Sequence, residues 1–77
     1  MEHQVRREWL KALRKEKNLT VRALAPLLDI SWSHYSDIEN GRRNPSVELS
    51  IRMAKFFDKN VMEFLENRVK HPKKDIS

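Results

Sequence analysis

The chain has 77 residues and no cysteine, which predicts one small domain without disulfides or thiolate metal sites and without a cleft between domains for catalysis. Its net charge of +5 favours an anionic partner. No apolar run is long enough to span a membrane, so the composition predicts a cytoplasmic protein with no membrane partner.

The first half of the chain has the spacing of two helices. Apolar residues four positions apart predict a first helix over about residues 5–17. Asn18 is suited to end that helix in the left-handed conformation. Thr20 then caps a second helix over about residues 21–28, whose inward face we expect to include Leu27.

A third helix follows a short turn. Asp29 tolerates the left-handed geometry that such a turn needs, and Ser31 is a good helix cap. The third helix is predicted over residues 32–40, and Gly41, the only glycine, is suited to close it in the left-handed conformation.

Two further helices complete the pattern. Ser46 caps a fourth helix over about residues 47–57. Asn60, with a glutamate three positions later, forms a capping box for a fifth helix over about residues 61–68.

Five short helices with short connections and no convincing strand predict an all-α, compact five-helix bundle. The domain would span residues 1–68, and residues 69–77 would form a basic, disordered tail. The second and third helices are joined by a four-residue turn, which is the spacing of a helix-turn-helix.

The exit of the third helix points to the partner. We expect the backbone amides there and the guanidinium groups of Arg42 and Arg43 to turn outward, next to Gly41. Such an arrangement suits a phosphate-bearing partner, and double-stranded DNA is the leading hypothesis.

The chain resembles the lambda-repressor-like (Cro/XRE) helix-turn-helix DNA-binding family over roughly residues 6–66. The resemblance rests on a string of residues at fixed spacings: Leu10-x-x-Leu13-Arg14, Leu19-Thr20, Leu24-Ala25, Ile30-Ser31 and Tyr35-Ser36-x-Ile38-Glu39-Asn40-Gly41-x-Arg43-x-Pro45-Ser46. It implies a bundle of the lambda-repressor-like type.

The resemblance also implies roles for single residues. Arg14 and Glu39 match the buried ion pair that joins the first helix to the end of the third, and either charge alone would be costly beside core positions. The residues placed to contact phosphates are Thr20, Arg22, Asn40, Arg42 and Arg43. The residues placed on the outward face of the third helix to read bases are Trp32, Ser33, Ser36 and Asp37.

Trp32 departs from the residues that the family commonly has at this position. Its indole suits packing on a thymine methyl or a sugar rather than bidentate hydrogen bonding. It could instead fold back over the second helix near Pro26, or anchor another protein. The sequence leaves these three interpretations open.

The fourth helix carries apolar residues on more than one face. We expect Val47, Ile51 and Ala54 to face inward. A second stripe is either buried by the first and fifth helices or forms a dimer seam. The candidate seam residues are Leu49, Met53, Phe56, Val61, Phe64 and Leu65.

The pattern does not favour catalysis. His34 and Asp37 lie one turn apart, but outward positions on one helix do not supply the converging geometry of a nucleophile and its base. We therefore expect no catalytic residues, no metal site and no cofactor.

The sequence predicts a sequence-specific transcriptional regulator that binds double-stranded DNA in the nucleoid. The finer hypothesis is a repressor that binds an inverted-repeat operator as a homodimer. The alternative is a protein-interaction module on the same fold, an antitoxin-like or anti-repressor component with weak or no base readout. A regulatory protein partner is compatible with both.

Overall fold

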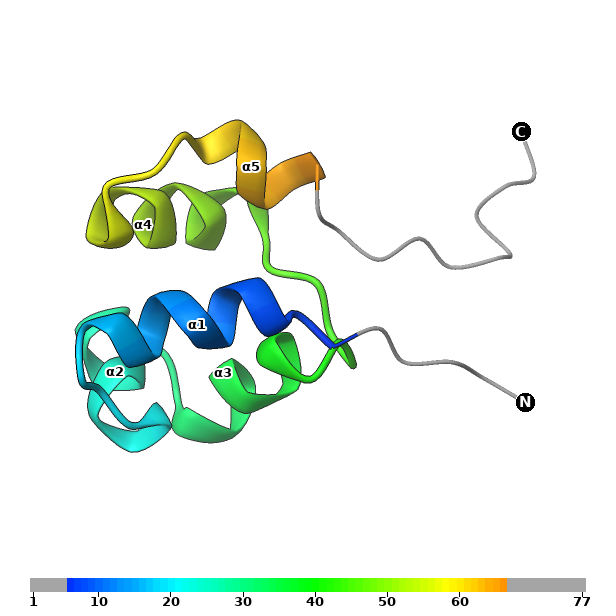
Figure 1. The fold of residues 1–77 in the computed structure, drawn as a ribbon. Coiled ribbons are helices and arrows are strands. Elements are labelled where there is room, and N and C mark those ends of the chain that lie inside the picture. The colour runs from blue at the N-terminus through cyan, green and yellow to red at the C-terminus, as the bar shows by residue number, and fades with distance from the viewer. Residues whose placement is uncertain (1–5, 67–77) are drawn as a thin grey trace.

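The computed structural model describes residues 6–66, which form five helices and no strand. The helices are α1 (Glu8–Glu16), α2 (Val21–Leu27), α3 (Trp32–Glu39), α4 (Val47–Phe57) and α5 (Val61–Glu66). Helices α2 and α3 pack on each other, α1 contacts α3, and α4 pairs with α5 (Figure 1). The predicted all-α bundle, with a helix-turn-helix formed by the second and third helices, is confirmed.

The first helix starts later than predicted, and the predicted C-terminal end lies outside the described residues. Helix α1 begins at Glu8 rather than near residue 5: Arg7 has a non-helical ψ of 76°, and its backbone N–H donates to the carbonyl oxygen of Glu39 at 2.8 Å. The end of the fifth predicted helix and the predicted tail at residues 69–77 lie outside the described residues.

Side-chain caps start the helices where the sequence predicts them. The side-chain oxygens of Thr20, Ser31 and Ser46 each accept a hydrogen bond, at 3.1 Å, from the backbone N–H three residues later. Asn60 Oδ1 accepts from the backbone N–H of Met62 at 2.9 Å. Each cap satisfies an amide that the first turn of a helix leaves unpaired.

The connections between helices use left-handed residues. Asn18, Asp29 and Gly41 have φ angles of 58°, 64° and 81°, as the sequence predicts. Asp58, with φ 59°, adopts the same left-handed conformation after α4, at a position where the sequence analysis predicts none. These single residues let the chain reverse direction within a few positions.

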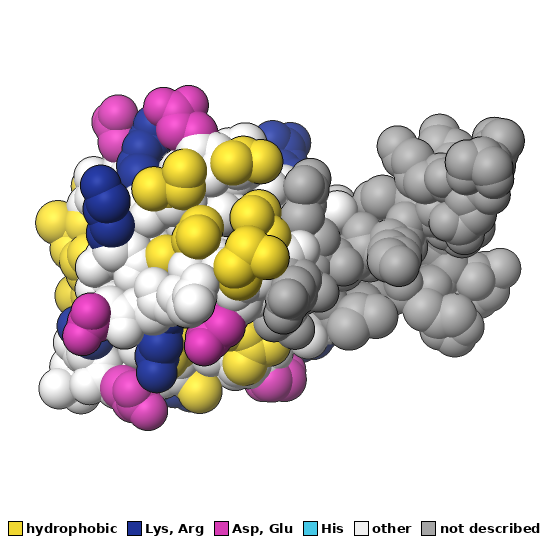
Figure 2. Space-filling model, turned by 90° about the horizontal axis from the view of Figure 1, so that it is seen from above, with side chains coloured by type: hydrophobic (Ala, Val, Ile, Leu, Met, Phe, Trp, Pro, Cys, Tyr) yellow, Lys and Arg dark blue, Asp and Glu magenta, His cyan; other side chains and the backbone are white. Residues whose placement is uncertain are grey.

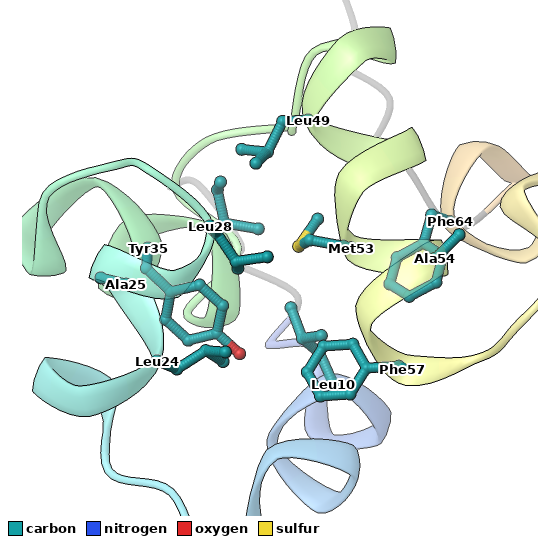
Figure 3. Close-up of a cluster of buried hydrophobic side chains, with 11 residues drawn as sticks. Leu10, Leu24, Ala25, Leu28, Tyr35, Leu49, Met53, Ala54, Phe57 and Phe64 are labelled. Carbon is teal, nitrogen blue, oxygen red and sulfur yellow. The ribbon is translucent and has the colours of Figure 1, made fainter.

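The core lies between the helix-turn-helix and α4. Leu24 of α2 and Leu28, which caps the end of that helix, are buried, and Figure 3 shows Leu49 and Met53 pointing from α4 toward Leu28. The expectation that Leu27 faces inward is wrong, since it is 59% exposed. The inward face is centred between Leu24 and Leu28, and Leu27 lies about 80° away from that centre around the helix.

Helix α4 is rotated relative to the prediction. Val47 and Ile51, expected in the core, are 54% and 41% exposed, whereas Leu49 and Met53 are buried. Ala54 is buried as expected.

Among residues 6–66, no helix has the length and the apolar character that crossing a membrane would require.

Candidate nucleic-acid interface

The exit of α3 is closed by hydrogen bonds to its own carbonyls. The N–H of Gly41 donates to Ile38 O at 3.2 Å, and the N–H groups of Arg42 and Arg43 donate to Asp37 O at 2.8 and 3.3 Å. This is the pattern of a glycine-terminated helix. The expectation of free outward amides is therefore wrong, and contacts to a phosphate at this turn fall to side chains.

The two arginines at the exit differ in their surroundings. Arg42 and Arg43 are both exposed. Arg42 Nη1 lies 3.5 Å from Asp37 Oδ1, in a pair whose side chains are 58% and 31% exposed. Within residues 6–66, no side chain forms an ion pair with Arg43. Arg43 therefore presents the less neutralised charge.

The outward face of α3 links predicted base readers to predicted phosphate contacts. Asn40 Nδ2 donates to Ser36 Oγ at 3.3 Å, one turn earlier on the same helix. Ser33 is exposed, and Ser36 and Asp37 are half-buried. Every predicted base reader thus keeps some accessible surface. Ser36 is hydrogen-bonded to Asn40, and Asp37 is paired with Arg42.

Trp32 lies against α2. The guanidinium carbon of Arg22 is 4.6 Å from the centroid of the Trp32 ring, which is the geometry of a cation–π contact. Trp32 remains 49% exposed. The indole therefore packs on a predicted phosphate-contacting residue and still offers half its surface. Thr20, at the start of the same helix, is exposed and serves as the cap.

A buried network fixes the end of α3 to α1. Arg14 Nε lies 2.7 Å from Glu39 Oε2, and Arg14 Nη2 lies 3.1 Å from Glu39 Oε1. The Tyr35 hydroxyl donates to Glu39 Oε2 at 2.9 Å, and Arg14 Nη1 donates to Leu19 O at 2.9 Å. The hydrogen bonds to Glu39 raise the pKa of Arg14. Burial, followed by the charge of Glu39, raises the pKa of Tyr35, so the phenol stays neutral.

Arg7 binds the turn after α3, and sequence reasoning missed this role. It is 3% exposed, and its guanidinium donates to Ile38 O at 2.6 Å, to Arg43 O at 3.2 Å and to Asn44 Oδ1 at 2.5 Å. In the sequence it is one of several basic residues near the first helix. No local pattern marks it, because its acceptors lie more than thirty positions away in the chain.

The candidate dimer seam needs a correction. Leu49, Met53 and Phe64 are 3%, 0% and 1% exposed, so they belong to the core and have no surface to offer a second copy. The other three candidates are half-buried: Phe56, Val61 and Leu65.

Exposed hydrophobic side chains do occur on the same two helices. Val47 and Ile51 of α4 and Met62 of α5 are 54%, 41% and 51% exposed. Figure 2, which looks down on α4 and α5, shows hydrophobic side chains gathered on this face with charged groups around them.

Within residues 6–66, no group of three histidine, aspartate or glutamate side chains is placed to hold a metal ion.

A known family matches the helix-turn-helix and its exit turn. The family model described as helix-turn-helix matches residues 10–64. The chain belongs to the helix-turn-helix family. The resemblance to lambda-repressor-like (Cro/XRE) domains is confirmed, and so is the predicted five-helix fold of that type.

Several relatives of this helix-turn-helix protein carry regulator names. It is 38% identical over 72 residues to the "uncharacterized HTH-type transcriptional regulator YqaF" of Bacillus subtilis (strain 168), covering 90% of this chain and 95% of the relative. It is 41% identical over 56 residues to the HTH-type transcriptional regulator AnsR of the same organism, covering 73% of this chain and 48% of AnsR.

A third relative is the HTH-type transcriptional regulator DdrOP3 of Deinococcus deserti, 37% identical over 59 residues, with 77% of this chain and 46% of the relative covered. The chain thus spans nearly all of YqaF and about half the length of AnsR and DdrOP3. The prediction of a DNA-binding regulator, as opposed to an enzyme, is confirmed at the level of the family.

Proposed function

We propose that this helix-turn-helix protein is a repressor that binds an inverted-repeat operator in double-stranded DNA as a homodimer. The observation that carries the proposal is the accessible face of α3, which begins at the half-exposed Trp32 and ends at the exposed Arg42 and Arg43. Repression needs only occupancy of a promoter site, so a small domain that covers DNA suffices.

Phosphate contacts would set the position of the protein on the duplex. We assign them to exposed or half-exposed side chains at two helix ends: Thr20 and Arg22 at the start of α2, and Asn40, Arg42 and Arg43 at the exit of α3. Such contacts hold register and orientation without reading sequence.

Base readout would come from Ser33, Ser36, Asp37 and Trp32 on the outward face of α3. Serine hydroxyls accept or donate to several bases, so they discriminate weakly. The exposed half of the Trp32 indole offers an apolar surface to a thymine methyl or a sugar. We expect much of the sequence preference to arise from DNA shape and deformability.

Dimerisation would use the exposed hydrophobic face of α4 and α5. Val47, Ile51 and Met62 form the proposed seam, with contributions from the half-buried Phe56, Val61 and Leu65. An exposed apolar face rimmed by charge is typical of an interaction surface. A twofold dimer on an inverted repeat would bring its two α3 helices about 34 Å apart, one turn of DNA.

The exposure of Leu27 favours a second candidate function. Leu27 and Trp32 are 59% and 49% exposed on the helix-turn-helix itself, where a DNA-binding surface usually carries polar groups. A protein-interaction module, antitoxin-like or anti-repressor, would use such side chains to dock a regulatory protein.

Unbiased selection from random duplex DNA at physiological salt separates the two candidates. A repressor of the proposed kind enriches a palindrome whose half-sites lie about 10 base pairs apart, centre to centre. Selection that enriches no sequence, with only weak salt-sensitive binding, would contradict the proposal and favour the protein-interaction module.

Replacing Arg43 by alanine tests the phosphate contacts. We expect affinity to fall by a similar factor on every DNA sequence, and the slope of log affinity against log salt to flatten by about 1, because one fewer counterion is released. Arg43→Lys keeps the charge and should keep the slope. Lys59→Ala, at an exposed position in the turn between α4 and α5, is the matched control and should leave the slope unchanged. An unchanged slope for Arg43→Ala would remove Arg43 from the interface.

A further inference from the structure

We infer that Arg7 is a positioning residue for DNA binding, which holds the exit turn of α3 in the conformation that presents Arg42 and Arg43. The inference rests on the proposed DNA-binding function. It adds to that function a residue that precedes α1 and lies outside the helix-turn-helix.

The contacts of Arg7 span the exit turn from its first residue to its last. The guanidinium donates to Ile38 O inside α3, to Arg43 O in the turn and to the side chain of Asn44 beyond it. The backbone N–H of Arg7 donates to Glu39 O. In Figure 1 the blue start of α1 lies beside the green connection that leads from α3 to α4.

The hydrogen bonds within the turn use the carbonyls of Asp37 and Ile38, and Arg7 adds bonds that tie the carbonyls of Glu39 and Arg43 to the residue before α1. The last carbonyls of a helix have no partner within the helix and carry partial negative charge, so a buried cation beside them is favourable. The planar fork of a guanidinium spreads five N–H donors over three nitrogens and so reaches acceptors that lie apart, whereas an ammonium group offers three donors from a single nitrogen. Arg7 thereby fills the inner side of the turn, and Arg42 and Arg43 remain exposed.

Arg7 cannot act as a phosphate contact itself, because it is 3% exposed. Its influence on DNA must pass through the residues that it holds. Arg43 is the most direct of these, since the same residue accepts a hydrogen bond from Arg7 through its carbonyl and extends an exposed guanidinium. Coupling between Arg7 and Arg43 is therefore the signature of a positioning role.

The experiment is a double-mutant cycle on duplex DNA with Arg7→Met, Arg43→Ala and the combination, each measured where denaturation curves show the protein folded. We expect Arg7→Met to weaken binding at least about 10-fold and to flatten the salt slope by about 1, although the residue touches no phosphate. In a protein that already carries Arg43→Ala, Arg7→Met should lower the affinity for DNA much less than it does in the wild type. Arg7→Lys, a milder variant that keeps the charge, should recover only part of the affinity.

Two controls isolate the positioning role. Arg6→Met removes the same charge at an exposed neighbouring position and should leave the cycle uncoupled. Phe57→Leu destabilises the core at the far end of α4 and should leave the affinity of the folded protein unchanged. Amide chemical shifts provide a readout without DNA: Arg7→Lys should move the resonances of residues 38–44 more than those of α4.

The outcomes separate this inference from the proposed function. Wild-type protein that binds no duplex DNA refutes the proposed function. Wild-type binding combined with unchanged affinity and slope in folded Arg7→Met, or with strict additivity between Arg7→Met and Arg43→Ala, overturns the positioning role alone.

Discussion

Replacing Glu39 by glutamine is expected to lower the free energy of unfolding by about 3–5 kcal/mol. The substitution keeps the shape of the side chain but leaves the guanidinium of Arg14 buried without its counter-ion, in a pair whose side chains are 10% and 8% exposed. A loss of this size approaches the whole stability of a small domain. Urea denaturation followed by circular dichroism measures it directly.

Two companion variants show whether the charge or the packing is responsible. Tyr35→Phe removes one hydrogen bond to Glu39 and leaves the ion pair, so it should cost only about 1–1.5 kcal/mol. Replacing both Arg14 and Glu39 by methionine removes both charges and should be less harmful than Glu39→Gln alone. A Glu39→Gln protein within about 1 kcal/mol of wild type would show that the pair is not the constraint that joins α1 to α3.

Replacing Ile51 by glutamate is expected to lower affinity for a full inverted repeat by about 10²–10⁴-fold while affinity for a single half-site stays nearly constant. Ile51 is 41% exposed on the hydrophobic face of α4 and α5, and a charge placed in an apolar seam must lose its hydration. Loss of the dimer removes the advantage of binding both half-sites at once. Sedimentation and paired measurements on full and half operators test it.

Ala12→Glu is the matched control, because it adds the same charge at an exposed position on α1. We expect Ala12→Glu to remain dimeric and to lose equal affinity, if any, on full and half operators. If the Ile51→Glu protein is dimeric and its affinity for the full operator is unchanged, the dimer interface does not include Ile51 and lies elsewhere on the surface. A wild-type protein that stays monomeric on an inverted repeat would contradict the homodimer itself.

The sequence predicts the starts of α2, α3 and α4 well because side-chain caps are local. Thr20, Ser31 and Ser46 each satisfy an amide three positions away, so the residue type and its place before an apolar stretch carry the information. The turn at Gly41 is local in the same sense. Such features depend little on the rest of the fold.

The face that α4 turns inward could not be predicted in this way. Val47 and Ile51 are spaced one turn apart, and so are Leu49 and Met53, so helical periodicity gives two equivalent stripes. Packing against α5 and the helix-turn-helix decides between them, and it buries Leu49 and Met53.

The candidate site divides along the same line. The family resemblance predicts the pairing of Arg14 with Glu39, and the cost of an unpaired charge beside core positions agrees with it, but no local spacing indicates the pair because the two residues are 25 positions apart. The contacts of Arg7 and the stacking of Arg22 on Trp32 depend on how separate helices meet, and no spacing in the chain encodes them.

The exposed pair between Asp37 and Arg42 has a consequence for which anions the protein retains. The Asp37 carboxylate is a tethered competitor that occupies Arg42 until another anion displaces it, and an exposed pair of this kind is worth at most about 1 kcal/mol. A lone phosphate gains little from the exchange. If Arg42 and Arg43 contact phosphates as proposed, a duplex would supply a second phosphate to Arg43 at the same moment, so a polymer would compete better for Arg42 than a single small anion. The exposed pair would then favour continuous backbones over isolated phosphates.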